Sequence, residues 1–244
     1  KCRHWKQIFH VSEEHFVKDL NAENRIDLYS FADALNTYLP DDATVITDAG
    51  FEELIIPSTI AFRESQRCLF PAAQGAMGYA VPAILGAYYA GRQEIITAVG
   101  DGSVMMNAQE LPLIAAHGIP VKIFVINNNM YAVIRKRQRD LFRTRTIGND
   151  PSDGLPAPNF AALAAFAGFA YACVERYDEL RGTLGEVLAS DRPVLCEVMC
   201  TPDQKYLHRS YAVGAGRRLE HRPLEDLAPF MERELLAREM CTEY

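Results

Sequence analysis

Short apolar runs alternate with helical segments along most of this chain of 244 residues, and no other feature limits its fold as strongly. The runs are rich in Val, Ile and Thr, which favour strands. The predicted strands are Thr44–Thr47, Glu94–Val99, Val121–Ile126, Ala170–Val174 and Val194–Met199. The predicted helices are Ile26–Leu39, Ala76–Ala90, Asn107–His117, Phe160–Ala167 and Tyr177–Ala189. Because strands separated by helices form βαβ units, we expect a three-layer α/β/α fold with a mostly parallel sheet.

The regular pattern occupies only part of the chain. Residues 1–24 are polar and lack a period, which indicates a linker or the tail of a preceding domain. We therefore expect one domain over residues 25–200 and a C-terminal extension over 201–244. Within them, Asp140–Pro158 and Thr201–Glu225 read as irregular stretches, the second leading to a short helical segment. The first residue is Lys, so we expect the chain either to begin inside a longer gene product or to have been processed.

Composition excludes several classes of protein. Hydrophobic residues make up 49% and charged residues 23%, as in soluble proteins with a core, and the net charge of −7 argues against nucleic-acid binding. No stretch of about 20 apolar residues could span a membrane, so we expect a cytoplasmic protein. The six cysteines form no CxxC pair and are expected to be reduced thiols. The group Cys2, His4, His10 and His15 does not have the spacing of a common zinc finger.

An acidic turn follows the predicted strand Glu94–Val99. Its residues are Gly100, Asp101, Gly102 and Ser103. The amides of Gly102 and Ser103 precede a helix, where backbone N–H groups and the helix dipole favour an anion. Since Asp101 would repel a bare phosphate, a carboxylate in this position indicates a bridging cation such as Mg²⁺.

A second polar turn, Asn127-Asn128-Asn129, follows the predicted strand Val121–Ile126. Neighbouring parallel strands end at the same edge of a sheet, so Asn128 is expected to offer the same cation a neutral oxygen. Taken alone, either sequence could be an ordinary turn. Their combination is more specific, because 24 residues that contain one helix and one buried strand separate Gly102 from Asn127.

Gly100-Asp101-Gly102, a gap of 24 residues and then Asn127-Asn128 resembles the thiamine-diphosphate signature, and the surrounding sequence resembles acetolactate synthase-type enzymes. Three further stretches are similar to that family, and the similarity covers about residues 25–200. They are Val45–Gly50, Gly75–Ala83 and Gly102–Leu111.

The resemblance implies thiamine diphosphate and Mg²⁺ as cofactors, with Asp101, Asn128 and the Met130 carbonyl as metal ligands. It implies that Gly102 and Ser103 contact the diphosphate. Met77 matches an apolar wedge that bends the cofactor, and Gly75 matches a contact to its aminopyrimidine. The expected cofactor-binding residues are Gly50, Gly75, Ala76, Met77, Gly100, Asp101, Gly102, Ser103, Asn128, Met130 and Tyr131. The sequence does not indicate whether FAD is used.

The chain departs from this family at two places. Phe51-Glu52 replaces a Gln-His pair that contacts diphosphate, and Arg137 replaces a Trp or Gln that shapes the acceptor pocket. Arg137 belongs to a basic cluster that also contains Arg135, Lys136, Arg139, Arg143 and Arg145. The cluster is either a solvated helix face or a patch for a phosphorylated or nucleotide-sugar-type acceptor.

The resemblance also implies that half of the active site lies outside this chain. Activation of the cofactor needs a glutamate from a pyrimidine-binding domain of the same or another chain, in a homodimer or homotetramer. Glu52, Glu53 and Glu110 lie on other motifs, so no residue of this chain is assigned to catalysis. We expect the chain alone to bind cofactor weakly and to turn over nothing.

Four functions remain to be compared. The first is a 2-keto acid decarboxylase and carboligase resembling acetolactate synthase; the second is a simple 2-keto acid decarboxylase subunit. The third is a non-catalytic cofactor-binding module, which the intact Asp101 and Asn128 oppose. The fourth is a dinucleotide dehydrogenase, but Gly75-Ala76-Met77-Gly78 lacks the G-x-G-x-x-G spacing.

Overall fold

The computed structural model describes residues 4, 24–142, 145–213, 219–228 and 230–240. The chain divides into two compact units, residues 20–204 and a smaller unit that includes residues 205–244, and each is described by itself. The boundaries expected at residues 24 and 200 stay a prediction. Cys2, His10, His15, Arg143 and the expected linker up to residue 23, apart from His4, lie outside the described residues.

The larger unit contains a six-stranded sheet whose strands all pair in parallel, in the order β2-β1-β3-β4-β6-β5. Its strands are β1 (Thr44–Thr47), β2 (Arg67–Leu69), β3 (Ile95–Gly100), β4 (Lys122–Asn127), β5 (Ala170–Val174) and β6 (Val194–Met199). The five predicted strands are confirmed, with ends that shift by at most one residue. Sequence reasoning missed β2, because a three-residue edge strand reading Arg-Cys-Leu has no run of β-branched residues.

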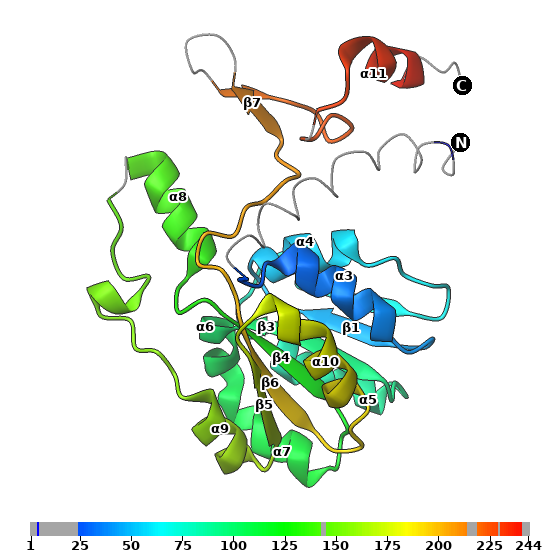
Figure 1. Ribbon diagram of the computed structural model, residues 1–244, viewed down its shortest axis with the longest axis vertical. Coiled ribbons are helices and arrows are strands. Elements are labelled where there is room, and N and C mark those ends of the chain that lie inside the picture. The colour runs from blue at the N-terminus through cyan, green and yellow to red at the C-terminus, as the bar shows by residue number, and fades with distance from the viewer. Residues whose placement is uncertain (1–3, 5–23, 143–144, 214–218, 229, 241–244) are drawn as a thin grey trace. The chain divides into compact units, whose positions relative to one another are not determined.

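Helices cover both faces of this sheet, as the predicted three-layer fold requires (Figure 1). On one face lie α3 (Leu28–Tyr38), α4 (Phe51–Thr59) and α10 (Tyr177–Leu188), and Phe31 of α3 meets Phe124 of β4 edge to face at 5.4 Å. On the other face α5 (Ala80–Tyr89), α7 (Leu111–Ala116) and α9 (Phe160–Ala167) enclose Ile123 and Val125. Every residue of β4 is therefore buried, which explains its nearly continuous apolar sequence.

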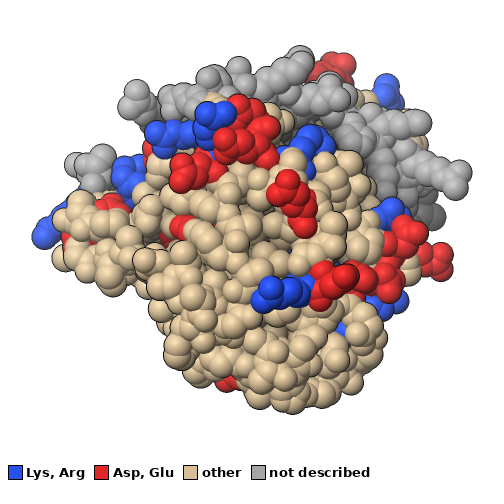
Figure 2. All heavy atoms as spheres, turned by 60° about the horizontal axis from the view of Figure 1, so that its bottom comes forward, with Lys and Arg blue, Asp and Glu red and all other residues tan. Residues whose placement is uncertain are grey.

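The outer surface of α5, α7 and α9 carries little charge. None of these helices contains Asp, Glu, Lys or Arg, and Tyr89, Leu113 and Phe166 are exposed on them. In the view of Figure 2, which brings the bottom of Figure 1 forward, charged side chains gather around a broad face that has few of them.

Two predicted helices differ from those observed. The helix predicted from Ala76 begins at Ala80, because Gly75 and Gly78 take left-handed φ values of 56° and 85° and form a turn before it. The helix predicted over Asn107–His117 is divided. A short helix α6 (Asp101–Val104) continues into a 3-10 segment, η1 (Met105–Glu110), where Asn107 leaves helical geometry, and then into α7.

Sequence reasoning did not predict two of the observed helices. Helix α4 was missed because it contains Pro57, a residue that usually interrupts a helix. Helix α8 (Ala132–Phe142) carries four residues of the basic cluster, Arg135, Lys136, Arg137 and Arg139, and it includes Asp140, where the loop was predicted to begin. A further short 3-10 helix, η2 (Pro151–Asp153), interrupts that loop.

The smaller unit contains an antiparallel hairpin of β7 (Tyr211–Val213) and β8 (Leu219–His221), followed by α11 (Arg233–Met240). Arg233 donates two hydrogen bonds to Asp226, of 2.6 and 2.8 Å. The prediction of an irregular stretch over Thr201–Glu225 is wrong at the hairpin, whereas the short C-terminal helix is confirmed. Within the described parts of the chain, no helix is both long and apolar enough to cross a bilayer.

The two-sided burial of β4 gives a stability prediction. Phe124 is fully buried, so Phe124→Ala should lower the free energy of unfolding by about 3–5 kcal/mol through lost burial and a cavity. Phe166→Ala is the matched control, because 76% of this side chain is exposed, and it should cost less than about 1 kcal/mol. Denaturant titration measures both, and equal losses would contradict the packing described.

Candidate active site

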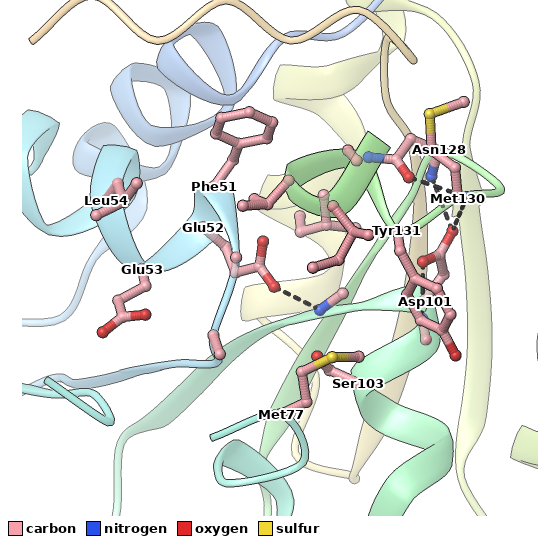
Figure 3. Close-up of a pocket in the computed structure, with 18 of the residues that line it drawn as sticks. Phe51, Glu52, Glu53, Leu54, Met77, Asp101, Ser103, Asn128, Met130 and Tyr131 are labelled. Atoms are coloured by element: carbon pink, nitrogen blue, oxygen red, sulfur yellow. Dashed lines mark hydrogen bonds between the residues drawn. The ribbon is translucent and has the colours of Figure 1, made fainter. Parts of the chain in front are cut away.

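A pocket of about 370 Å³ lies at the carboxyl ends of the middle strands, a usual location for ligands in parallel α/β sheets. Most of its lining comes from four places: residues 49–54 after β1, the turn with Gly75 and Met77 before α5, residues 100–103 where β3 runs into α6, and the turn after β4 with the start of α8. Figure 3 shows Glu52 and Asp101 approaching from opposite sides, with Met77 between them at one end. Ten of the eleven predicted cofactor-binding residues line the pocket. The exception is Ala76, which is exposed and lies outside the lining.

Asp101 is the central polar group of the pocket. Its Oδ1 accepts a hydrogen bond from the Gly102 amide at 2.7 Å, and its Oδ2 accepts from the amides of Asn128 and Met130 at 3.2 and 3.3 Å. Burial raises the pKa of Asp101 to about 6, although these amides oppose the rise. Among the described residues no Lys or Arg forms an ion pair with it. A cation bound to Asp101 would stabilise its charged form.

The turn after β4 brings the other expected metal ligands to Asp101. The Asn128 Oδ1 lies 3.2 Å from the Met130 nitrogen, the same nitrogen that Asp101 Oδ2 approaches. A carboxylate oxygen and an amide oxygen therefore converge on one backbone atom, and such hard oxygens suit Mg²⁺. A donor set of one carboxylate and one amide oxygen, without sulfur or imidazole, fits a hydrated Mg²⁺.

Gly102 lies directly against Tyr131. A Cβ added to Gly102 would be 2.1 Å from the Tyr131 Cε1, so only glycine fits here. The Tyr131 amide in turn donates to the carbonyl of the buried Asn149 at 2.9 Å. These contacts hold the turn at Gly102, the start of α8 and the loop that contains Asn149 together.

Asp48, at the end of β1, holds the turn that carries Met77. Its carboxylate accepts hydrogen bonds from the amides of Ala49 at 2.8 Å, Gly78 at 2.9 Å and Ala80 at 2.8 Å. Burial raises its pKa, and these bonds oppose that rise. Asp48 belongs to the stretch Val45–Gly50 that is similar to the family, but sequence reasoning assigned it no positioning role. The signal available was its place immediately after a buried strand.

Glu52 lies inside the pocket, which sequence reasoning did not predict. Its side chain is 5% exposed and its Oε1 accepts a hydrogen bond of 3.0 Å from the Gly100 amide. A Cβ at Gly50 or Gly100 would come within 2.4 or 2.9 Å of this carboxyl group, so both glycines make room for it. Burial first, with repulsion from Asp48 and Asp101, raises the pKa of Glu52 to about 8.

The basic residues of α8 differ in their partners. Lys136 pairs with Asp140 at 2.5 Å and Arg139 with Asp203 at 3.3 Å. Arg135 lies 3.8 Å from Asp150. Arg137 lines the pocket instead, and no carboxylate among the described residues forms an ion pair with it. One side chain of the cluster is thus available to an anion in the pocket.

The comparisons with known proteins agree with this geometry. Residues 48–198 match the family described as "Thiamine pyrophosphate enzyme, C-terminal TPP binding domain". The chain therefore belongs to the thiamine pyrophosphate enzymes and represents their C-terminal cofactor-binding domain.

Within that family the chain is similar to acetolactate synthase large subunits. It is 28% identical to that of Lactococcus lactis over 174 residues, 71% of this chain and 30% of that protein. It is 31% identical to the isozyme 2 large subunit of Escherichia coli over 160 residues, 65% and 29% of the two chains. The thiamine diphosphate-dependent 4-hydroxybenzoylformate decarboxylase of Rhodococcus jostii matches in structure with a TM-score of 0.65 and 28% identity, over 75% of this chain and 34% of that one. The chain thus spans about a third of these relatives.

The raised pKa of Glu52 predicts a pH-dependent stability. An ordinary Glu has a pKa of 4.5, so between pH 4.5 and about 8 unfolding releases a proton from Glu52. The stabilisation is complete below pH 4.5 and is lost as the pH rises through 8. In metal-free protein, raising the pH from 5 to 8.5 should lower the free energy of unfolding of the wild type by roughly 2–4 kcal/mol more than that of Glu52→Gln.

Chemical denaturation at several pH values measures this difference. Glu186→Gln, on the exposed side of α10, serves as the control and should follow the wild type. Parallel pH profiles for the wild type and Glu52→Gln would show that Glu52 ionises alike in the folded and unfolded chain.

Proposed function

We propose that this chain provides the diphosphate-binding half of the active site of a 2-keto acid decarboxylase and carboligase that resembles acetolactate synthase. The observation that carries the proposal is the convergence of Asp101, Asn128 and the Gly102 turn in one pocket with Met77. Thiamine diphosphate supplies the carbanion chemistry when it is bound. The chain's own residues bind, orient and shield it.

In this proposal Asp101, Asn128 and the Met130 carbonyl hold Mg²⁺, which in turn holds the diphosphate. Gly102 and Ser103, at the start of α6, contact the diphosphate, and the Ser103 amide donates to its oxygens, since the Gly102 amide donates to Asp101. Met77 lines the same pocket with its side chain 37% exposed, as a wedge against a bent cofactor requires. Gly75 contributes the backbone beside the aminopyrimidine.

The carboxylate that activates the cofactor would come from a pyrimidine-binding domain of the same or another chain, in a homodimer or homotetramer. The relatives named above are about three times as long as the matched region, which leaves room for such a domain. A simple 2-keto acid decarboxylase is the second candidate, favoured by the similarity to the Rhodococcus decarboxylase. The intact Asp101 and Asn128 oppose a non-catalytic module.

The position of Arg137 supports the proposal that the acceptor is anionic, either phosphorylated or nucleotide-linked. It lines the pocket from α8, whereas Lys136 and Arg139 are paired with carboxylates. An unpaired guanidinium at a pocket edge can form charge-assisted hydrogen bonds with a carboxylate or phosphate.

Cofactor binding tests the metal site. In the complete protein that contains this chain, thiamine diphosphate should bind in a Mg²⁺-dependent way, and Asp101→Ala should weaken binding at least about 100-fold, through loss of a charged ligand. Calorimetric titration with and without Mg²⁺ measures the effect, and Asp203→Ala, an exposed acid, is the control. Binding of the same strength without Mg²⁺ would refute the metal assignment.

Acceptor choice tests Arg137. Arg137→Gln should lower the preference for phosphorylated over neutral acceptors about tenfold, because one charge-assisted contact is removed. Product analysis by mass spectrometry, with pyruvate as donor and paired acceptors, gives the ratio of kcat/KM values. Arg139→Gln should leave the ratio unchanged, and an unchanged ratio in Arg137→Gln would exclude this role.

A further inference from the structure

Asn127 connects the turn after β4 to the neighbouring strand β6. Its Nδ2 donates a hydrogen bond of 2.6 Å to Glu197 Oε1, and its Oδ1 accepts one of 2.9 Å from the Asn129 amide. The Asn127 side chain is 3% exposed, and both bonds are partly buried. One side chain therefore joins a β6 carboxylate to the backbone of the turn that carries Asn128 and Met130.

The turn needs this support because its backbone is unusual. Asn129 has a φ of 55°, in the left-handed region that residues other than glycine seldom adopt. The Asn129 amide donates its hydrogen bond to Asn127 Oδ1, and the residues on either side, Asn128 and Met130, donate theirs to Asp101. The Asn127 carbonyl also accepts a bond of 2.8 Å from the Cys200 amide at the end of β6. The side chain of Asn127 is thus bonded to β6, and its backbone carbonyl is bonded to the residue that follows β6.

A second hydrogen bond, to its other carboxylate oxygen, also holds the Glu197 side chain in place. Tyr171 of the edge strand β5 donates a hydrogen bond of 2.5 Å to Glu197 Oε2. Strand pairing places Glu197 beside Val125 of β4 and Cys173 of β5, so its carboxylate lies between the two strands that flank β6. None of these residues lines the pocket, and the chain of bonds runs from Tyr171 through Glu197 and Asn127 to Asn129.

We propose that Glu197 is a positioning residue for the metal site: through Asn127 it fixes the turn of residues 127–130 in the conformation that presents Asn128 and the Met130 carbonyl. The proposal rests on the proposed binding of Mg²⁺ by that turn. Groups that orient metal ligands from behind commonly change metal affinity by 10- to 100-fold when they are removed.

The experiment measures thiamine diphosphate binding to the complete protein at a series of Mg²⁺ concentrations. Glu197→Ala should raise the half-saturating Mg²⁺ concentration at least about tenfold. Glu197→Gln should stay within about threefold of the wild type, because its amide oxygen still accepts from Asn127 and its amide nitrogen faces the Tyr171 hydroxyl. Tyr171→Phe removes only the outer bond and should also stay within about threefold.

These variants separate positioning from general stability. Loss of fold stability alone would lower the thermal midpoint and the amount of cofactor bound without moving the half-saturating Mg²⁺ concentration, and that result in Glu197→Ala would overturn the proposal. If Glu197→Ala does not fold, Glu197→Asp replaces it, since its shorter side chain loses the Asn127 contact while keeping the charge. An unchanged Mg²⁺ dependence there would be equally decisive.

The outcome also separates this proposal from the one on which it rests. A wild-type protein that binds cofactor independently of Mg²⁺ refutes both proposals. Mg²⁺-dependent binding that Asp101→Ala abolishes and Glu197→Ala leaves unchanged refutes only the role of Glu197.

Discussion

The hydrogen bonds that Asp101 accepts join the ends of two neighbouring strands. Gly102 belongs to the turn after β3, whereas Asn128 and Met130 belong to the turn after β4. Because β3 and β4 pair in parallel and lie side by side in the sheet, both turns leave it at the same edge. The pocket, the anion-binding amides and the expected metal ligands all depend on this one connection.

Three buried carboxyl groups surround the site, and the backbone stabilises them unequally. The amides of three other residues donate to Asp48 and three to Asp101, whereas Glu52 accepts one bond from Gly100 besides that of its own amide. A buried charge needs such partners. The arrangement therefore favours charged Asp48 and Asp101 and a neutral Glu52, so one acid can lie near a diphosphate without repelling it.

The sequence allowed the sheet and the centre of the site to be predicted, for physical reasons. Buried parallel strands have nearly continuous apolar sequences, and the Asp101 and Asn128 turns follow two of them. The family resemblance then supplied expected roles for Met77 and Gly75. The comparisons confirm the family and the fold, while the individual roles stay predictions.

Other features depend on contacts that no local pattern records. The turn at Met77 was taken for helix because its apolar residues continue the period of α5, and only the left-handed glycines interrupt it. Sequence reasoning assigned Glu52 no role in the site, yet it accepts a hydrogen bond from Gly100, 48 residues away. The bond between Asn127 and Glu197 spans 70 residues. Such pairs follow from the strand order, which the sequence did not specify.

Helix α8 has a feature with consequences for how such a pocket changes over time. It supplies Val133, Ile134 and Arg137 to the pocket wall, and yet none of its residues is fully buried. Substitutions on a helix without core residues alter the free energy of unfolding little. This wall of the pocket can therefore diverge, in evolution or in the laboratory, while the sheet and the Asp101 connection stay as they are. The residues that shape this wall and the residues that hold the fold together lie in separate parts of this chain.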